Sequence, residues 1–197
     1  NWRVALMRPG DNPIGNLAQS LAVDSVLYDT NNNPDIPRSS IIEAVLRRSG
    51  NGLINVYDRA NLTETDNLLI IVDQFEEFFT NPENYYNENP SQDSQIVVNL
   101  VLETARIALQ QNLPIYVVCT MRSDYIGQCS SFRGLPEYIG YSQFFVPRLK
   151  RKELKQVIEE PALLSGNRIT LRLTERLVYD LAEGVDQLPI LQHALSQ

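Results

Sequence analysis

The sequence is poor in the residues that build disulfide, metal or histidine-based sites. Two cysteines in 197 residues make no disulfide framework, and Cys119 and Cys129 do not have the spacing of metal ligands. Any Ser-His-Asp or Cys-His hydrolase would need the single histidine, His193, as its base, and no nucleophile elbow accompanies it. We therefore expect free thiols, with Cys119 buried in an apolar strand, and a reducing, cytoplasmic setting.

Long apolar runs and positive charge are also scarce. No run approaches the roughly 20 residues that a membrane span requires. The net charge of −7 argues against binding to nucleic acid or to an anionic membrane. The chain has three lysines, Lys150, Lys152 and Lys155, and none of them follows a glycine. The 197 residues therefore contain no G-x-x-x-x-G-K-[ST] phosphate loop.

What the chain does have is the stretch NLLIIVDQFEEFFT, residues 67–80. The unbroken apolar run Leu68–Val72 is typical of a strand buried on both faces of a parallel sheet, which indicates an α/β fold. In such sheets functional side chains follow the carboxyl ends of the strands. Asp73 stands at that point and could bind Mg²⁺ directly or through water. The alternative is an aspartate that only caps the next helix.

Further strands are predicted at Arg3–Met7, Ile115–Cys119 and Phe144–Val146. We expect all four strands to lie parallel in one sheet with helices on both faces. From about Arg151 the sequence becomes helical, so we predict an α/β core over residues 1–150 and a helical subdomain over residues 151–197.

The helices and loops are predicted from amphipathic spacing and capping residues. The predictions are a helix from Pro13 to Ala22, a helix through Arg48 with a capping box of Ser40 and Glu43, a polar surface loop Asn81–Gln95, a helix Ile96–Gln111, a helix Lys152–Glu160 ended at Pro161, a helix Glu175–Glu183 capped by Thr174, and a last helix beginning at Pro189.

Five stretches of the sequence together resemble a known family. LLIIVDQFEEFFT lies between WRVALMRPGDNP and VVCTMRSDYIGQC, and IEEPALLSG and LPILQHALSQ follow near the end. This order resembles the novel-STAND group of signal-transduction P-loop NTPases over essentially the whole chain. The resemblance implies an ASCE/STAND-type, AAA/NACHT-like ATPase core that uses ATP and Mg²⁺. The family's phosphate-binding loop (Walker A) lies upstream of the segment that begins at Asn1, so we expect a fragment of a longer protein.

The resemblance assigns roles to the residues around Asp73. Asp73 would be the Walker B aspartate that holds the metal. Related ATPases often place a catalytic glutamate next, but here that position is Gln74, which can orient water and cannot accept a proton. Glu76 or Glu77 would then supply the base, and we favour Glu76. The alternative is that both glutamates only open a helix, where its dipole favours them.

Arg122 and Pro189 are the remaining site residues that the resemblance implies. Arg122 matches the sensor position, where a guanidinium binds the γ-phosphate. The rival interpretation is a salt bridge from Arg122 to Asp124 or Asp73. Pro189 is similar to the proline of the family's Gly-x-Pro motif, which contacts the nucleotide base, although Gln187 replaces the glycine.

The resemblance implies a nucleotide switch in a bacterial signalling or defence protein. Its ligands would be ATP and ADP, its sensor or effector domains would lie on the same polypeptide, and activation would produce a homo-oligomer. The full-length protein would be an ATPase, and the isolated chain would be inactive. The alternative is a non-catalytic scaffold or protein-interaction domain that keeps the fold; a phosphate loop before Asn1 would favour the first function and its absence the second.

Overall fold

The computed structural model describes residues 1–27, 36–60, 62, 63, 65–182, 191 and 193. The chain forms two compact units, Asn1–Gln143 and Phe144–Gln197. The predicted division at residues 150 and 151 remains a prediction about family domains. Among the described residues, no helix combines the length and the apolar composition that a bilayer span needs.

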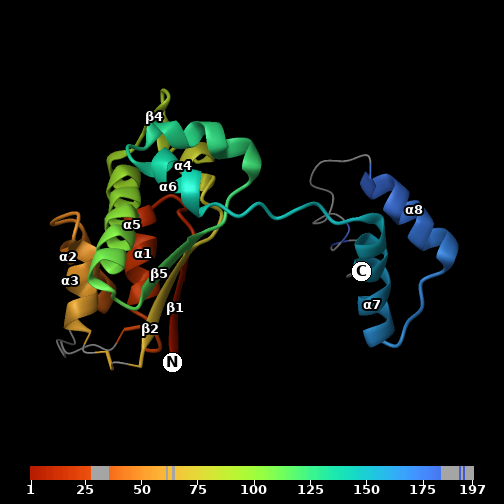
Figure 1. Ribbon diagram of the computed structural model, residues 1–197, viewed down its shortest axis with the longest axis horizontal. Helices are drawn as coiled ribbons and strands as arrows, with labels where there is room; N and C mark the ends of the chain where they lie inside the picture. The colour runs from red at the N-terminus through yellow and green to blue at the C-terminus, as the bar shows by residue number, and fades with distance from the viewer. Residues whose placement is uncertain (28–35, 61, 64, 183–190, 192, 194–197) are drawn as a thin grey trace. The chain divides into compact units, whose positions relative to one another are not determined.

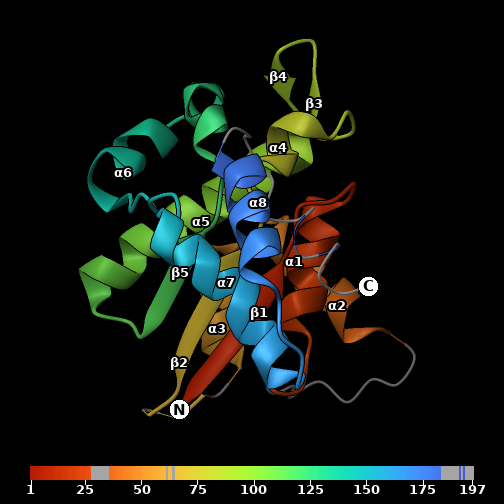
Figure 2. The same cartoon turned by 90° about the vertical axis from the view of Figure 1, so that its right-hand side faces the viewer.

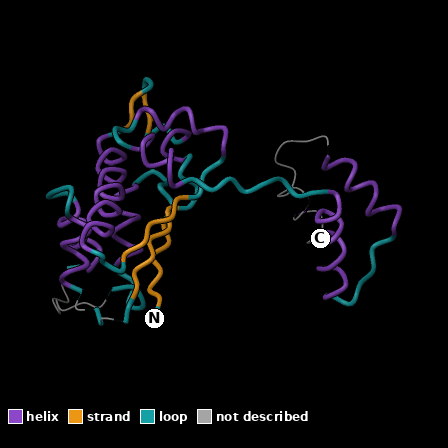
Figure 3. Tube along the Cα trace, in the orientation of Figure 1, coloured by secondary structure: helices purple, strands orange, loops and turns teal. Residues whose placement is uncertain are grey.

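A three-stranded sheet forms one layer of the first unit, beside its helices (Figure 3). Its strands are β1 (Trp2–Met7), β2 (Asn67–Val72) and β5 (Ile115–Cys119), all parallel and in the order β1-β2-β5. The last residues of the three strands are level with one another. Apolar runs rich in Ile and Val form β2 and β5, as parallel pairing favours, and β1 has the sequence WRVALM. The α/β class and these strand positions are confirmed.

Helices of the first unit cover one face of this sheet (Figures 1 and 2). The residues of β1 and β2 that point to this face, such as Ala5, Leu68 and Ile70, are fully buried. Helices α1 (Pro13–Leu21) and α5 (Gln92–Gln111) pack on the strands, and α2 (Arg38–Leu46) and α3 (Gly52–Arg59) pack against these two helices.

The opposite face of the sheet is bare within the described part of the first unit. Trp2, Leu6 and Tyr116 point to it and keep 57%, 60% and 48% of their surface exposed. The rings of Trp2 and Tyr116 lie 5.2 Å apart on this surface. The expectation of helices on both faces is therefore wrong for the described first unit. The prediction that Cys119 is buried is also wrong, since it lies exposed at the end of the edge strand.

Local capping explains where the helices differ from their predictions. Helix α1 begins as predicted because Pro13 fits the first turn and Asn12 accepts a hydrogen bond from the Gly15 N–H at 3.1 Å. Helix α2 instead begins after Pro37, so Ser40 lies inside it and the predicted capping box is wrong. Helix α3 was not predicted.

The segment predicted as a polar loop, residues 81–95, contains regular structure. A short antiparallel hairpin pairs β3 (Tyr85–Tyr86) with β4 (Asn89–Pro90). Its two turn residues, Asn87 and Glu88, have φ of 48° and 61°, the left-handed pair that tight hairpins require. Helix α5 then begins at Gln92, before the predicted start, because Ser91 caps it.

Three helical segments follow the carboxyl ends of β2 and β5. They are α4 (Glu77–Thr80), the 3₁₀ helix η1 (Ser123–Ser131) and α6 (Leu135–Ser142). The predicted fourth strand is wrong: Phe144–Val146 forms no strand in the described structure, and all three side chains are exposed. These apolar residues open the second unit and belong to no strand pair.

The second unit contains two described helices, α7 (Arg151–Leu164) and α8 (Leu171–Ala182), which pack around Ile158, Val178 and Leu191. Helix α7 continues through Pro161, so the predicted break there is wrong; proline removes one N–H donor while the following turns still close. Helix α8 begins before Thr174, which is buried inside it, so the predicted cap is also wrong. The predicted helix at Pro189 lies outside the described residues.

Candidate functional site

Three polar residues follow directly after the three parallel strands: Arg8 after β1, Asp73 after β2 and Thr120 after β5. The sheet continues for one residue beyond the strands, since Asp73 N–H donates to the Met7 carbonyl at 2.9 Å and Thr120 N–H donates to the Val72 carbonyl at 3.0 Å. The strand register therefore brings the three side chains together at the carboxyl edge of the sheet.

Asp73 is the centre of this group. Its Oδ1 accepts a hydrogen bond from the Thr120 hydroxyl at 2.7 Å, and its Oδ2 accepts one from Arg8 Nε at 2.9 Å. Both contacts stabilise the carboxylate, so they hold the pKa of Asp73 below its usual value, with the Thr120 hydrogen bond as the largest cause. Asp73 is therefore ionised at neutral pH and has its two oxygens oriented by neighbouring strands.

Thr120 links the strand end to the turn that follows Asp73. The Gln74 N–H donates to Thr120 Oγ1 at 3.1 Å, and the Phe75 N–H donates to the Thr120 carbonyl at 2.8 Å. Because its oxygen already accepts from Gln74, the hydroxyl directs its own proton to Asp73. Gln74 has a left-handed backbone, with φ of 54°, and its side chain is exposed. The turn thus places Gln74 beside Asp73 in sequence and turned towards solvent.

The two glutamates beyond Gln74 differ in their surroundings. Glu77 Oε2 accepts a hydrogen bond from the Gly10 N–H at 2.8 Å, which ties α4 to the turn after β1. Glu76 is half-buried, and its Oε2 is shielded from solvent without a hydrogen-bond partner among the described residues. Buried carboxylate oxygens normally have partners. Glu77 is therefore engaged by the turn after β1, and Glu76 keeps one oxygen without a partner among the described residues.

The turn formed by Arg8, Pro9 and Gly10 is held by asparagine side chains. Asn16 Nδ2 donates to the carbonyls of Arg8 and Pro9 at 3.1 and 2.9 Å. The Gly10 carbonyl accepts from two further asparagine side chains on the segment after α4. The backbone that carries Arg8 is therefore anchored at several points, which leaves its side chain as the part able to move.

Arg122 follows the same strand end, three residues beyond the last residue of β5, with Thr120 and Met121 between. Its Nη2 forms a salt bridge with Asp124 Oδ2 at 2.7 Å, as one of the two rival interpretations expected. Its guanidinium also lies 5.9 Å from the centre of the Tyr125 ring. The Tyr125 ring in turn stacks on Phe79 of α4, with centroids 6.3 Å apart and planes within 5°. The cation and the turn after Asp73 are thus connected through two aromatic rings.

Sequence reasoning brought together Asp73, Gln74, Glu76 and Arg122, and it missed Arg8 and Thr120. The signal for both was available, because each is the first polar residue after a predicted strand, as Asp73 is. Their roles follow only from the register of the sheet. Pro189, the predicted contact to a nucleotide base, lies outside the described residues.

The donor set at this edge fits one kind of metal site. Within the described ranges no cluster of three His, Cys, Asp or Glu side chains could hold a metal. Mg²⁺ in nucleotide sites takes one or two carboxylates and keeps waters and phosphate oxygens as its other ligands. Asp73, a carboxylate at the carboxyl end of β2, suits that requirement.

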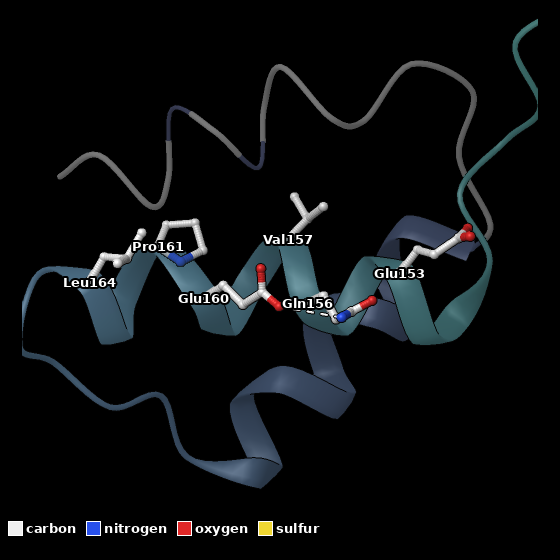
Figure 4. Close-up of a pocket in the computed structure, with 6 residues that line it drawn as sticks. All are labelled: Glu153, Gln156, Val157, Glu160, Pro161 and Leu164. Atoms are coloured by element: carbon white, nitrogen blue, oxygen red, sulfur yellow. Dashed lines mark hydrogen bonds between the residues drawn. The ribbon is translucent and has the colours of Figure 1, made fainter.

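A separate groove runs along α7 in the second unit (Figure 4). Its six lining residues come from that one helix, and Gln156 donates to Glu160 across one turn at 3.3 Å. The lining residues are Glu153, Gln156, Val157, Glu160, Pro161 and Leu164. Two carboxylates and no cation make this a poor place for a phosphate group.

Comparison with known proteins gives one match. The model of a family described as "Novel STAND NTPase 1" matches residues 1–197, the whole of the sequence. No curated protein and no solved structure matches the chain.

Proposed function

The chain belongs to the novel STAND NTPase 1 family, and from this we propose that its first unit handles the terminal phosphates and metal of ATP in a signalling switch. The observation that carries the proposal is the set of polar side chains at the carboxyl edge of β1, β2 and β5. Ligands of open α/β sheets bind at this edge. The core would then be of the ASCE/STAND type.

Each side chain has a task in this proposal. Asp73 would hold Mg²⁺ directly or through water, and the metal would supply positive charge beside the phosphates. Exposed Gln74 would orient the attacking water, with Glu76 as the proton acceptor. Arg122 would leave Asp124 to bind the γ-phosphate in a fork of hydrogen bonds. Pro189 would contact the nucleotide base.

The phosphates themselves need a binding loop that the 197 residues do not contain. Consecutive backbone N–H groups and one lysine supply most phosphate affinity in this fold. Without them a triphosphate would lie beside Asp73, Glu76 and Glu77 in a chain of net charge −7. We expect no micromolar binding of Mg²⁺-ATP to this chain in calorimetry. Such binding would show that the nucleotide site lies elsewhere.

The proposal is tested by ATP hydrolysis in a polypeptide that also carries a phosphate loop. Asp73→Ala should lower the Mg²⁺-dependent rate, and Arg122→Ala should preserve ATP binding while lowering turnover. Each lost contact to a developing phosphate charge costs a few kcal/mol, or about two to three orders of magnitude in rate. Arg106→Ala is the control, because Arg106 pairs with Glu103 along α5. Folded Asp73 and Arg122 variants with unchanged rates would refute these roles.

A second function, a scaffold that keeps the fold without turnover, has one observation in its favour. Both oxygens of Asp73 already have partners within the chain, Thr120 and Arg8. Asp73 could therefore have only a structural role, in which it joins the ends of the three strands by these contacts. Under this alternative, Asp73→Ala would lower stability and leave partner binding independent of nucleotide.

The proposed setting follows from the family. We place the chain in a cytoplasmic protein of bacterial signalling or defence, with sensor or effector domains on the same polypeptide. ATP and ADP states would change the packing of the helical part on the core, and activation would produce a homo-oligomer. Size-exclusion chromatography with light scattering, in the presence of ATP and of ADP, tests this expectation directly.

A further inference from the structure

Arg8 contacts one oxygen of Asp73, Oδ2, with two of its nitrogen atoms. Its Nε donates a hydrogen bond to Oδ2 at 2.9 Å, and its Nη2 lies 2.9 Å from the same oxygen as an ion-pair contact. The guanidinium therefore covers Oδ2 on the side where a further ligand would approach. The other oxygen, Oδ1, accepts a hydrogen bond from Thr120. In this arrangement the Arg8 guanidinium occupies the position beside Asp73 where a metal cation could bind.

We propose that Arg8 is a positioning residue for Asp73, and that Arg8 and a divalent cation bind Asp73 in alternation. The inference deepens the proposed function and rests on it, since it assumes that Asp73 is the metal carboxylate. It adds a residue to the site that no motif assignment included. Arg8 would keep the carboxylate ionised and oriented until the cation arrives.

Alternation follows from charge and geometry. A divalent cation on Asp73 and a guanidinium at hydrogen-bond distance from the same carboxylate would lie a few ångströms apart. At that separation the repulsion between a double and a single positive charge is large, even with partial solvent screening. The cation must therefore displace the guanidinium to bind directly.

The structure allows Arg8 to leave without moving the sheet. Asn16 fixes the backbone carbonyls of Arg8 and Pro9, while the Arg8 side chain is 59% exposed. Such exposed ion pairs contribute little net stability, because water replaces both partners readily. Rotation of one side chain is then enough to open Oδ2.

The alternation can be tested with the metal alone and the 197-residue chain. Mn²⁺ is added to ¹⁵N-labelled protein, and its paramagnetic line broadening is followed at the amides of Asp73 and Gln74. Arg8→Gln removes the competing charge and keeps a polar, shorter side chain. We expect it to raise the Mn²⁺ affinity at these amides about fivefold or more. Asp73→Asn should abolish the local broadening.

A matched control removes the same charge elsewhere. Arg47→Gln breaks a two-point ion pair with Asp93, at 2.6 and 2.8 Å, on helices of the covered face. It should leave the Mn²⁺ affinity at Asp73 unchanged. In the unmodified chain, diamagnetic Mg²⁺ should also release the Arg8 Nε–H, which is seen as loss of its exchange-protected NMR signal. A merely structural role for Arg8 would move neither readout.

The outcomes separate this inference from the proposed function. Broadening that depends on Asp73 and is equally strong with Arg8 and with Arg8→Gln would overturn the alternation and leave the metal role intact. An equal gain in Arg47→Gln would overturn it too, because net charge would then be the cause. No Asp73-dependent broadening in any variant would refute the metal role itself, and the alternation with it.

Discussion

Phe78 is the side chain whose loss should damage the site most from within the core. It is fully buried in α4, and its ring lies 4.8 Å from Phe75 and 5.9 Å from Phe132, both edge to face. These rings join the turn after Asp73 to the segment after η1. Replacing a buried phenylalanine with alanine costs about 3 to 5 kcal/mol, a range that already includes lost edge-to-face contacts of about 0.5 to 1.5 kcal/mol each. We expect Phe78→Ala to lower the free energy of unfolding by about 4 kcal/mol.

The measurement is urea unfolding followed by the fluorescence of Trp2, the only tryptophan, which reports on the first unit alone. With a slope of about 2 kcal/mol per molar urea, the midpoint should fall by about 2 M. Leu109→Ala is the control, since Leu109 is 86% exposed on α5. Phe78→Leu should fall between the two. A loss below about 1 kcal/mol for Phe78→Ala would refute the role of this ring in holding the two segments together.

Two further predictions use the same urea assay. Thr63 donates hydrogen bonds that lower the pKa of Asp66 from 3.8 to about 2. The stability that this carboxylate contributes should be fully present above the unfolded pKa and be lost as pH falls through about 2. Asp66→Asn should flatten this pH dependence of stability, and an unchanged profile would contradict the prediction. Gly10→Ala should cost about 1 to 2 kcal/mol, because φ is 54° and the new Cβ would lie 2.8 Å from Asn16 Nδ2; Gly127→Ala, with open space around it, should cost far less, and equal losses would refute the argument.

Apolar runs in the sequence predicted strands correctly where a neighbouring strand was available to pair with them. Leu68–Val72 and Ile115–Cys119 are apolar runs bounded by polar residues, and each became a parallel strand. The same pattern at Phe144–Val146 predicted a strand that is absent from the described structure. An apolar run becomes a strand only when a neighbouring strand accepts its hydrogen bonds, and the sequence of the run does not contain that information.

The predicted helix boundaries are wrong where a serine or threonine that resembles an N-cap lies inside the helix. Ser40 and Thr174 looked like caps, yet both lie inside longer helices that begin one turn earlier. A serine or threonine can cap a helix or bond within it, and tertiary packing decides between the two. The hairpin after α4 was missed because its strands have two residues each, too few to show alternation.

The location of the candidate site was predictable from the sequence, but the side chains that contact Asp73 were not. Asp73 was identified because the carboxyl end of a buried strand is the usual place for function. Its contact with Arg8 joins residues 65 positions apart, and its contact with Thr120 joins residues 47 positions apart. Such pairs depend on strand order and register, which a single sequence does not fix.

The bare face of the sheet has a practical consequence for handling this protein. Trp2, Leu6 and Tyr116 form an apolar surface next to β5, which leaves one edge of backbone donors and acceptors unpaired in the described sheet. Exposed apolar patches beside an open edge strand are the usual starting point of aggregation. A surface of this kind can bind an apolar segment of the same chain or of another during synthesis. The yield of soluble protein should therefore fall steeply as protein concentration and temperature rise.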